Sequence, residues 1–400
     1  MSGRNPDEAH RAATPLELLF DLCFVVAVAQ AAGALHHDFA EGEIGHGVLS
    51  YLWVFFAIWL PWLNFTWFAS AYDTDDVLYR LVTFVQITGV LVVTAGVQSA
   101  FEDLDFRIMV TGYVIMRIAL VAQWLRVARE DPGRRRTALR FALAIALLQA
   151  GWALRLLIPL PLGLVVLLVL GVLEMLVPIW AEGAGQPTPW NAQHITERYG
   201  LFTIIVIGEC VLAATTAVEA AISAGGLSVP LLAVAIGGLL LVFGLWWVYF
   251  KDTAALGQRA SLRSAIAWSY GHYVVFAAVA ALGAGLQVAA ETTQDLVELP
   301  ASLAASTVAV PVVAYLLAIG VLHGRSDPLR AIRSSLGLAV VLVLVIAGAA
   351  TWIGVALAVL AMGVVVAALI AAHVASTQRT SDAVSDAASA AAPKGDLRPG

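Results

Sequence analysis

The sequence has 400 residues, of which 60% are hydrophobic and only 12% are charged, and its formal net charge is −6. Its mean hydropathy of +0.87 excludes an ordinary soluble domain. The apolar runs are continuous rather than alternating with polar residues, which argues against a β-barrel. The composition therefore predicts a polytopic α-helical membrane protein.

Apolar runs of about 20 residues recur along the chain, and each can cross a hydrocarbon core of roughly 30 Å. They predict an all-α fold with about twelve transmembrane helices, at residues 16–35, 47–69, 79–100, 105–127, 137–157, 160–181, 199–220, 228–250, 266–289, 301–323, 329–349 and 351–375. Only AATWIG separates the last two, so ten or eleven spans remain alternatives.

The basic residues predict the orientation in the membrane. If both termini are cytoplasmic, most lysines and arginines fall on the inner side, and only Arg107 and Arg155 fall on the outer side. Arg117 lies inside a span. Because basic residues gather on the cytoplasmic side, we expect a multi-pass protein of the bacterial plasma membrane with N-in and C-in topology.

The chain divides into two halves of six spans each. ELLFDLCFVVAV opens the first half and ERYGLFTIIVIGE the second. This similarity predicts two parallel six-helix repeats, at 15–182 and 197–375, joined by a connector at 183–196. A cytoplasmic lead-in (1–14) and a disordered cytoplasmic tail (376–400) are expected at the ends. Chance similarity between apolar helices is the alternative.

Glu209 and Arg117 are the two deepest ionisable residues. A charged group at the bilayer centre costs about 2.5–3.5 kcal/mol on insertion scales, so it needs a partner, a proton or a water-filled cavity. The sequence predicts a Glu209–Arg117 pair at mid-depth, either as a static structural pair or as part of a proton path. Without that partner, Glu209 would carry a proton near neutral pH.

More polar residues occupy the cytoplasmic side of the spans. Glu17 and Asp21 lie four residues apart, and therefore on one face of the first helix. Other polar residues at similar depth predict a polar vestibule: Glu174, Glu197, His272 and Asp252. For His272, simple packing within the core is the alternative.

Aromatic residues crowd the second span, YLWVFFAIWLPWLNFTWF. Phe55, Trp59 and Trp62 share one helical face there, where they could line a site for a flat or cationic substrate. Packing against lipid is the alternative.

The outer loop HHDFAEGEIGH contains metal-ligand residue types without a standard ligand spacing, and we interpret it as an acidic solvated loop. The two cysteines, Cys23 and Cys210, are predicted to pack within spans. No metal site is therefore predicted.

No phosphate-binding or dinucleotide motif is present, so no other cofactor is predicted either. The expected partners are the lipid bilayer and an unidentified small solute, and no nucleic acid is expected.

ELLFDLCFVVAVAQ, ERYGLFTIIVIGECVLA and SYGHY together resemble the bacterial low temperature requirement A family over roughly residues 15–375. The resemblance implies a multi-span inner-membrane protein, and it implies no established biochemical activity. The residues that it marks are Glu17, Phe20, Asp21, Glu197, Arg198, Gly208, Glu209 and His272. Members of the family usually have serine where this chain has Cys210, so a hydroxyl role is not expected there.

The leading hypothesis is a secondary transporter, with proton coupling. Glu209 would be the protonatable group and Arg117 its partner, while Asp21, Glu17 and His272 would form a relay on the cytoplasmic side. One alternative is a membrane-embedded enzyme that acts on a lipid or isoprenoid-like substrate with Asp21 or Glu209 as general acid. The other is a non-catalytic membrane scaffold or sensor.

Overall fold

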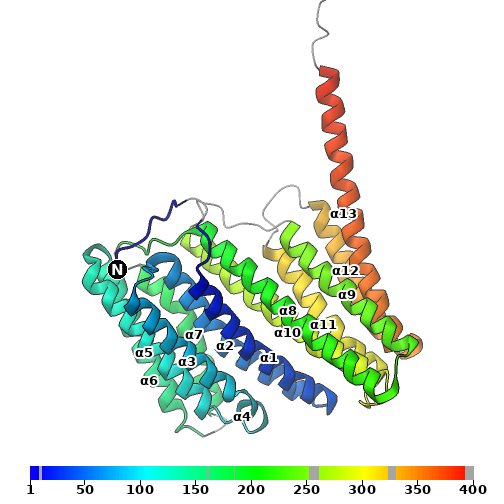
Figure 1. Ribbon diagram of the computed structural model, residues 1–400, viewed down its shortest axis with the longest axis horizontal. Helices are drawn as coiled ribbons and strands as arrows, with labels where there is room; N and C mark the ends of the chain where they lie inside the picture. The colour runs from blue at the N-terminus through cyan, green and yellow to red at the C-terminus, as the bar shows by residue number, and fades with distance from the viewer. Residues whose placement is uncertain (9–10, 160–161, 184, 252–260, 323–329, 392–400) are drawn as a thin grey trace, which may run out of the picture.

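Figure 1 shows the computed structural model, which describes residues 1–8, 11–159, 162–183, 185–251, 261–322 and 330–391. Over these residues the regular secondary structure is entirely helical. The elements are α1 (Pro15–Ala40), α2 (Ile44–Tyr72), α3 (Val77–Ala95), α4 (Val97–Glu102), α5 (Arg107–Glu130), the 3-10 turn η1 (Pro132–Arg134), α6 (Arg135–Arg155), α7 (Leu162–Glu182), α8 (Ala192–Gly225), α9 (Val229–Lys251), α10 (Leu262–Thr292), α11 (Ala301–Leu322), α12 (Arg330–Ile353) and α13 (Val355–Ala391).

In the described part of the chain, twelve helices are long and apolar enough to cross a membrane, which confirms the predicted fold class. The last two are separate helices because Gly354, between them, has a φ of +81°. This left-handed backbone conformation suits glycine and interrupts the helix. The choice of twelve spans rather than ten or eleven is therefore confirmed.

Two helices differ from the predicted bounds in ways that matter. α8 begins at Ala192 rather than at residue 199, because the Asn191 side chain accepts the His194 N–H and caps the helix there. α13 continues to Ala391, through part of the tail expected to be disordered. Its sequence has neither glycine nor proline between residues 376 and 391 to interrupt a helix.

The helices of the two halves form two groups that meet along α1, α2, α8 and α10. In Figure 1, α1–α7 lie to one side and α9, α11, α12 and α13 to the other. Both α1 and α2 contact α8 and α10 across the boundary. The first helix of each half, α1 or α8, therefore lies at this boundary.

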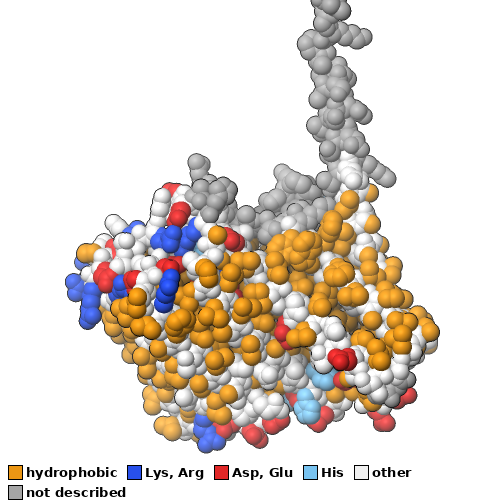
Figure 2. Space-filling model, in the orientation of Figure 1, with side chains coloured by type: hydrophobic (Ala, Val, Ile, Leu, Met, Phe, Trp, Pro, Cys, Tyr) orange, Lys and Arg blue, Asp and Glu red, His pale blue; other side chains and the backbone are white. Residues whose placement is uncertain are grey.

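The charged residues separate the two ends of the molecule. Figure 2 shows Lys and Arg side chains gathered at the upper end and acidic side chains along the lower edge, with an apolar band between them. We call the upper end the basic end; the start of α3, the end of α5, η1 and the start of α6 lie there (Figure 1) and carry Arg80, Arg126, Arg129, Arg134, Arg135 and Arg136. The start of the chain and the described end of α13 both lie toward this end (Figure 1).

Candidate functional site

Two carboxylates lie on one face of α1, near the basic end. A capping box starts the helix at a defined residue: the Thr14 hydroxyl accepts the Glu17 N–H, and Glu17 Oε2 accepts the Thr14 N–H at 2.8 Å. Asp21 follows one helical turn later. Since residues four apart share a helical face, both acids point toward the same neighbouring helices.

The facing helix, α8, carries two basic side chains with the same spacing. Arg198 Nη1 lies 2.9 Å from Glu17 Oε1, and Arg198 Nε donates to Asp21 Oδ2 at 3.2 Å. Arg198 Nη2 donates to Asp21 Oδ1. His194 Nε2 lies 3.3 Å from Glu17 Oε1. We call Glu17, Asp21, His194 and Arg198 the ion cluster.

A tryptophan from α2 completes the surroundings of Asp21. The Trp62 indole N–H donates to Asp21 Oδ1 at 2.7 Å. Trp62 and all four residues of the ion cluster have 0% relative exposure. In such a low-dielectric site each charge depends strongly on its hydrogen-bonded partners. Three helices thus hold the cluster at the boundary between the two halves.

Replacing Trp62 with phenylalanine is expected to lower the free energy of unfolding by about 1.5–3 kcal/mol, because a hydrogen bond to a buried charge is lost. Trp59→Phe is the matched control. Trp59 is equally buried on the same helix, but its indole N–H has no hydrogen-bond partner in the described structure. Thermal unfolding of the purified variants measures the difference. Equal losses for both variants would mean that the Trp62–Asp21 bond contributes little.

The residues before α1 fold back onto the basic end of α2. The Arg4 N–H donates to the Ala71 carbonyl at 3.0 Å, and the Arg11 guanidinium donates to the Ala69 carbonyl at 2.9 Å and to the Ser70 carbonyl. Burial lowers the pKa of Arg11. The lead-in is therefore an ordered cover on this helix end.

Arg117 has a different partner from the predicted one. Its Nη2 donates to Glu174 Oε2 at 3.0 Å, and Trp152 Nε1 donates to the other carboxylate oxygen at 3.3 Å. The expected Glu209–Arg117 pair is therefore wrong. Sequence position gave the depth of Arg117 but not its direction around the α5 axis, which turns it toward α7. Arg117 and Glu174 are both buried.

Glu209 lies on α8, half-buried, and forms neither a hydrogen bond nor an ion pair with any described residue. It belongs to neither buried group of charges. Its role as a protonatable residue stays a prediction.

His272 does not contact the carboxylates of the ion cluster. Its Nδ1 lies 2.8 Å from the Trp268 carbonyl oxygen, and its Nε2 lies 3.2 Å from the Tyr249 hydroxyl. The Tyr199 ring lies between His272 and Trp62, at centroid distances of 4.9 Å from each. Among the described residues His272 therefore makes no direct contact with Asp21, and the Tyr199 and Trp62 rings lie between them.

The other predicted vestibule residues are not all described. Glu197 is exposed and accepts the Ala13 N–H at 3.3 Å. Asp252 lies outside the described residues. Glu174 is the vestibule residue that pairs with Arg117, as given above. The predicted vestibule therefore does not form as one continuous group.

The aromatic face of α2 is buried against other helices rather than exposed to lipid. Phe55 contacts Tyr273, with ring centroids 5.7 Å apart, and Trp59 lies 5.3 Å from the same ring. Trp62 stacks on Phe202 at 4.3 Å. These side chains fill the boundary between α2, α8 and α10, and Trp62 alone of the three hydrogen-bonds to the ion cluster.

His194 was missed by the sequence reasoning, and Arg198 entered it only through the family resemblance. The predicted span began at residue 199, which left His194 in the connector and Arg198 just before the span. The signal was nevertheless present in HITER, where His194 and Arg198 repeat the four-residue spacing of Glu17 and Asp21. Complementary charges at matching positions in the two halves indicate a contact between them.

The histidines of the outer loop pair with acids at the end opposite the basic end. His36 Nε2 lies 2.8 Å from Glu291 Oε2, which links α1 to α10, and His46 Nδ1 lies 2.9 Å from Asp38 Oδ2. Over the described ranges, three or more potential metal ligands do not come together.

Comparison with known proteins places the chain in one family. The family model of the bacterial low temperature requirement A protein matches residues 12–375. The chain is also 27% identical, over 244 residues, to an uncharacterized protein of Rhizobium meliloti (strain 1021). That match covers 59% of this chain and 58% of the relative. No solved structure matches the chain.

Proposed function

The chain belongs to the bacterial low temperature requirement A protein family, and we propose that it is a proton-coupled secondary transporter of a small solute. The ion cluster is the observation that carries this proposal. It joins α1 of the first half to α8 of the second, so the two halves cannot separate there without breaking buried ion pairs. Such a contact is suited to be a gate between the halves.

The charge of the cluster explains how a proton would control the gate. Glu17, Asp21 and Arg198 together carry one excess negative charge while His194 is neutral. An uncompensated buried charge costs several kcal/mol. The closed cluster therefore favours one bound proton, which neutralises it. When the helices separate and water enters, the acids are solvated and the proton is released.

The position of the cluster indicates which gate it is. Asp21 lies six residues into α1, or roughly 9 Å from the start of that helix. The basic end faces the cytoplasm in this proposal, as the positive-inside rule requires for an N-in and C-in protein. The ion cluster is then the cytoplasmic gate.

The two halves act as repeats in this scheme. α3, α5, α6 and α7 contact one another in succession, and α10, α11, α12 and α13 repeat that order of neighbours. In transporters built from parallel repeats, the halves rock against each other about a shared site. Acids on α1 and bases on the corresponding α8 would make the closed state specific.

Uptake into proteoliposomes tests the proposal. Purified protein is reconstituted, an inward proton gradient is imposed, and the vesicles are exposed to a mixture of bacterial metabolites that is then analysed by mass spectrometry. We expect at least one solute to accumulate, and a protonophore to abolish its accumulation. Chemical conversion of a lipid without any accumulation would contradict transport and favour the membrane-enzyme alternative.

A further inference from the structure

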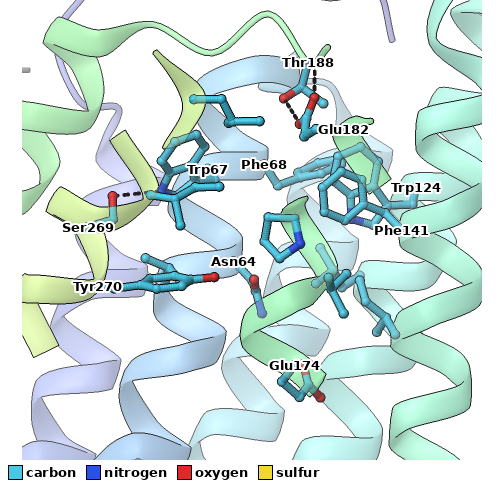
Figure 3. A pocket seen from close by; sticks show the side chains of 17 residues that line it. Asn64, Trp67, Phe68, Trp124, Phe141, Glu174, Glu182, Thr188, Ser269 and Tyr270 are labelled. Carbon is cyan, nitrogen blue, oxygen red and sulfur yellow. Dashed lines mark hydrogen bonds between the residues drawn. The ribbon is translucent and has the colours of Figure 1, made fainter. Parts of the chain in front are cut away.

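A second polar site lies between α2, α5, α6, α7 and α10. Figure 3 shows this pocket with Glu182 and Thr188 at one end, Glu174 at the other, and aromatic side chains between them. Its volume is about 40 Å³. This space is enough for a few water molecules or for the charged group of a small ligand.

One of its two carboxylates forms no ion pair with a described residue, and the Arg134 charge acts on it only from a distance. Glu174 is paired with Arg117 at 3.0 Å. Glu182 accepts the Thr188 N–H at 2.8 Å and the Thr188 hydroxyl, but it forms no ion pair with any described residue. Both carboxylates are buried. The pocket therefore retains one negative charge that a cation would balance.

The helix α7 between the two carboxylates is interrupted in its backbone hydrogen bonding. Pro178 lines the pocket and has no N–H for a helical hydrogen bond to the Glu174 carbonyl. The Tyr270 hydroxyl donates to the next carbonyl, that of Met175, at 2.6 Å. The Glu174 carbonyl therefore lacks its usual helical donor, while Tyr270 satisfies the carbonyl of Met175.

Aromatic rings form the other walls. In Figure 3, Trp67 lies on one side, and Phe68, Trp124 and Phe141 lie on the opposite side. Trp124 and Phe141 are stacked, with centroids 4.3 Å apart and an interplanar angle of 6°. The faces of aromatic rings attract cations. The aromatic walls and the Glu182 carboxylate therefore both favour a positively charged ligand.

Asn64 supplies a half-buried polar group that pairs with none of the described residues. Its amide lies within the pocket in Figure 3 and forms no hydrogen bond with any described residue. In a membrane protein, a polar side chain at this depth normally finds a partner. A ligand with a polar group would provide one.

The pocket has a neighbouring cavity toward the basic end. A larger cavity of about 370 Å³, lined in part by Pro187, Pro189 and Trp190, shares Thr188 and Leu262 with the pocket. The two cavities therefore adjoin at Thr188, whose N–H and hydroxyl bind Glu182.

We propose that this pocket binds a small organic cation, a protonated primary amine, with its ammonium group on Glu182. Glu182 keeps acceptor positions after its two hydrogen bonds from Thr188, and an ammonium group has three donors to fill them. The inference rests on the proposed function, because it names the class of solute that the transporter would carry.

Ligand binding tests this inference without a membrane gradient. The full-length protein in detergent is titrated with ethylammonium chloride and followed by tryptophan fluorescence, since Trp67 and Trp124 line the pocket. We expect saturable binding that is at least tenfold weaker in Glu182→Gln and unchanged in Glu197→Gln, an exposed glutamate on α8. Ethanol, the neutral analogue, is expected not to saturate.

Two results would overturn the inference: no saturation with the wild type, or equal affinity in wild type and Glu182→Gln. If Glu182→Gln does not fold, Asn64→Leu, which fills the pocket, is expected to weaken binding to the same extent. Binding of ethylammonium without coupled uptake of any solute would contradict the proposed function alone. Coupled uptake of another solute by a protein that does not bind ethylammonium would contradict this inference alone.

Discussion

Replacing Arg198 with methionine is expected to lower the free energy of unfolding by about 3–5 kcal/mol, because it leaves two buried carboxylates without a cation. Glu17 and Asp21 would retain hydrogen bonds from Thr14 and Trp62, but no arginine. Thermal unfolding of the purified protein in detergent measures this loss, and a reduced amount of protein in the membrane should accompany it.

Two variants make this result interpretable. Arg80→Met removes an arginine whose ion pair with Asp75 is exposed at the same end, and it is expected to have little effect. Arg198→Lys keeps the charge but loses the planar fork that binds both acids, so an intermediate stability is expected. If Arg198→Met unfolded at the same temperature as Arg80→Met, the ion cluster would not stabilise the contact between α1 and α8.

Asp21→Asn is expected to fold normally and to lose proton-coupled uptake. Asparagine has nearly the shape of aspartate and can still accept the Trp62 N–H. The cluster would then contain one acid and one arginine, which is neutral without an added proton. The gate would stay closed at any pH, so we expect coupled uptake in dye-loaded proteoliposomes to fall at least tenfold.

The control for this variant is Asp75→Asn, which makes the same chemical change at an exposed position of the basic end. It is expected to transport as the wild type does. Coupled uptake that survived in Asp21→Asn, with protein of normal stability, would show that the proton is carried elsewhere, for example on Glu209.

Helix number could be predicted because it depends on a local property of the chain, whereas the N-in and C-in orientation stays a prediction. Apolar length decides whether a segment spans the membrane, and the distribution of Lys and Arg decides which way it inserts. The same reasoning located Glu17 and Asp21 correctly, near the basic end and on one face of α1. Depth along a helix follows directly from residue number at about 1.5 Å per residue.

Partner choice could not be predicted, because it depends on how each helix is rotated and on which helices are neighbours. Arg117 and Glu209 have comparable depths, yet Arg117 faces Glu174 on α7. The start of α8 depends on the Asn191 cap, a polar side chain within a segment that hydropathy assigns to a loop. Because the helix was predicted to begin at residue 199, His194 and Arg198 were not placed on it, and half of the ion cluster was not predicted from the pattern of the sequence.

The central claim is that one proton on the ion cluster holds α1 and α8 together. The most direct measurement is the distance between spin labels at Leu19→Cys on α1 and Gln193→Cys on α8, both exposed positions, after Cys23 and Cys210 have been replaced by serine. We expect one short distance at pH 5.5, and a second, longer population at pH 8.5 that is absent in Asp21→Asn. The same distance distribution at both pH values in the wild-type cluster would contradict the account.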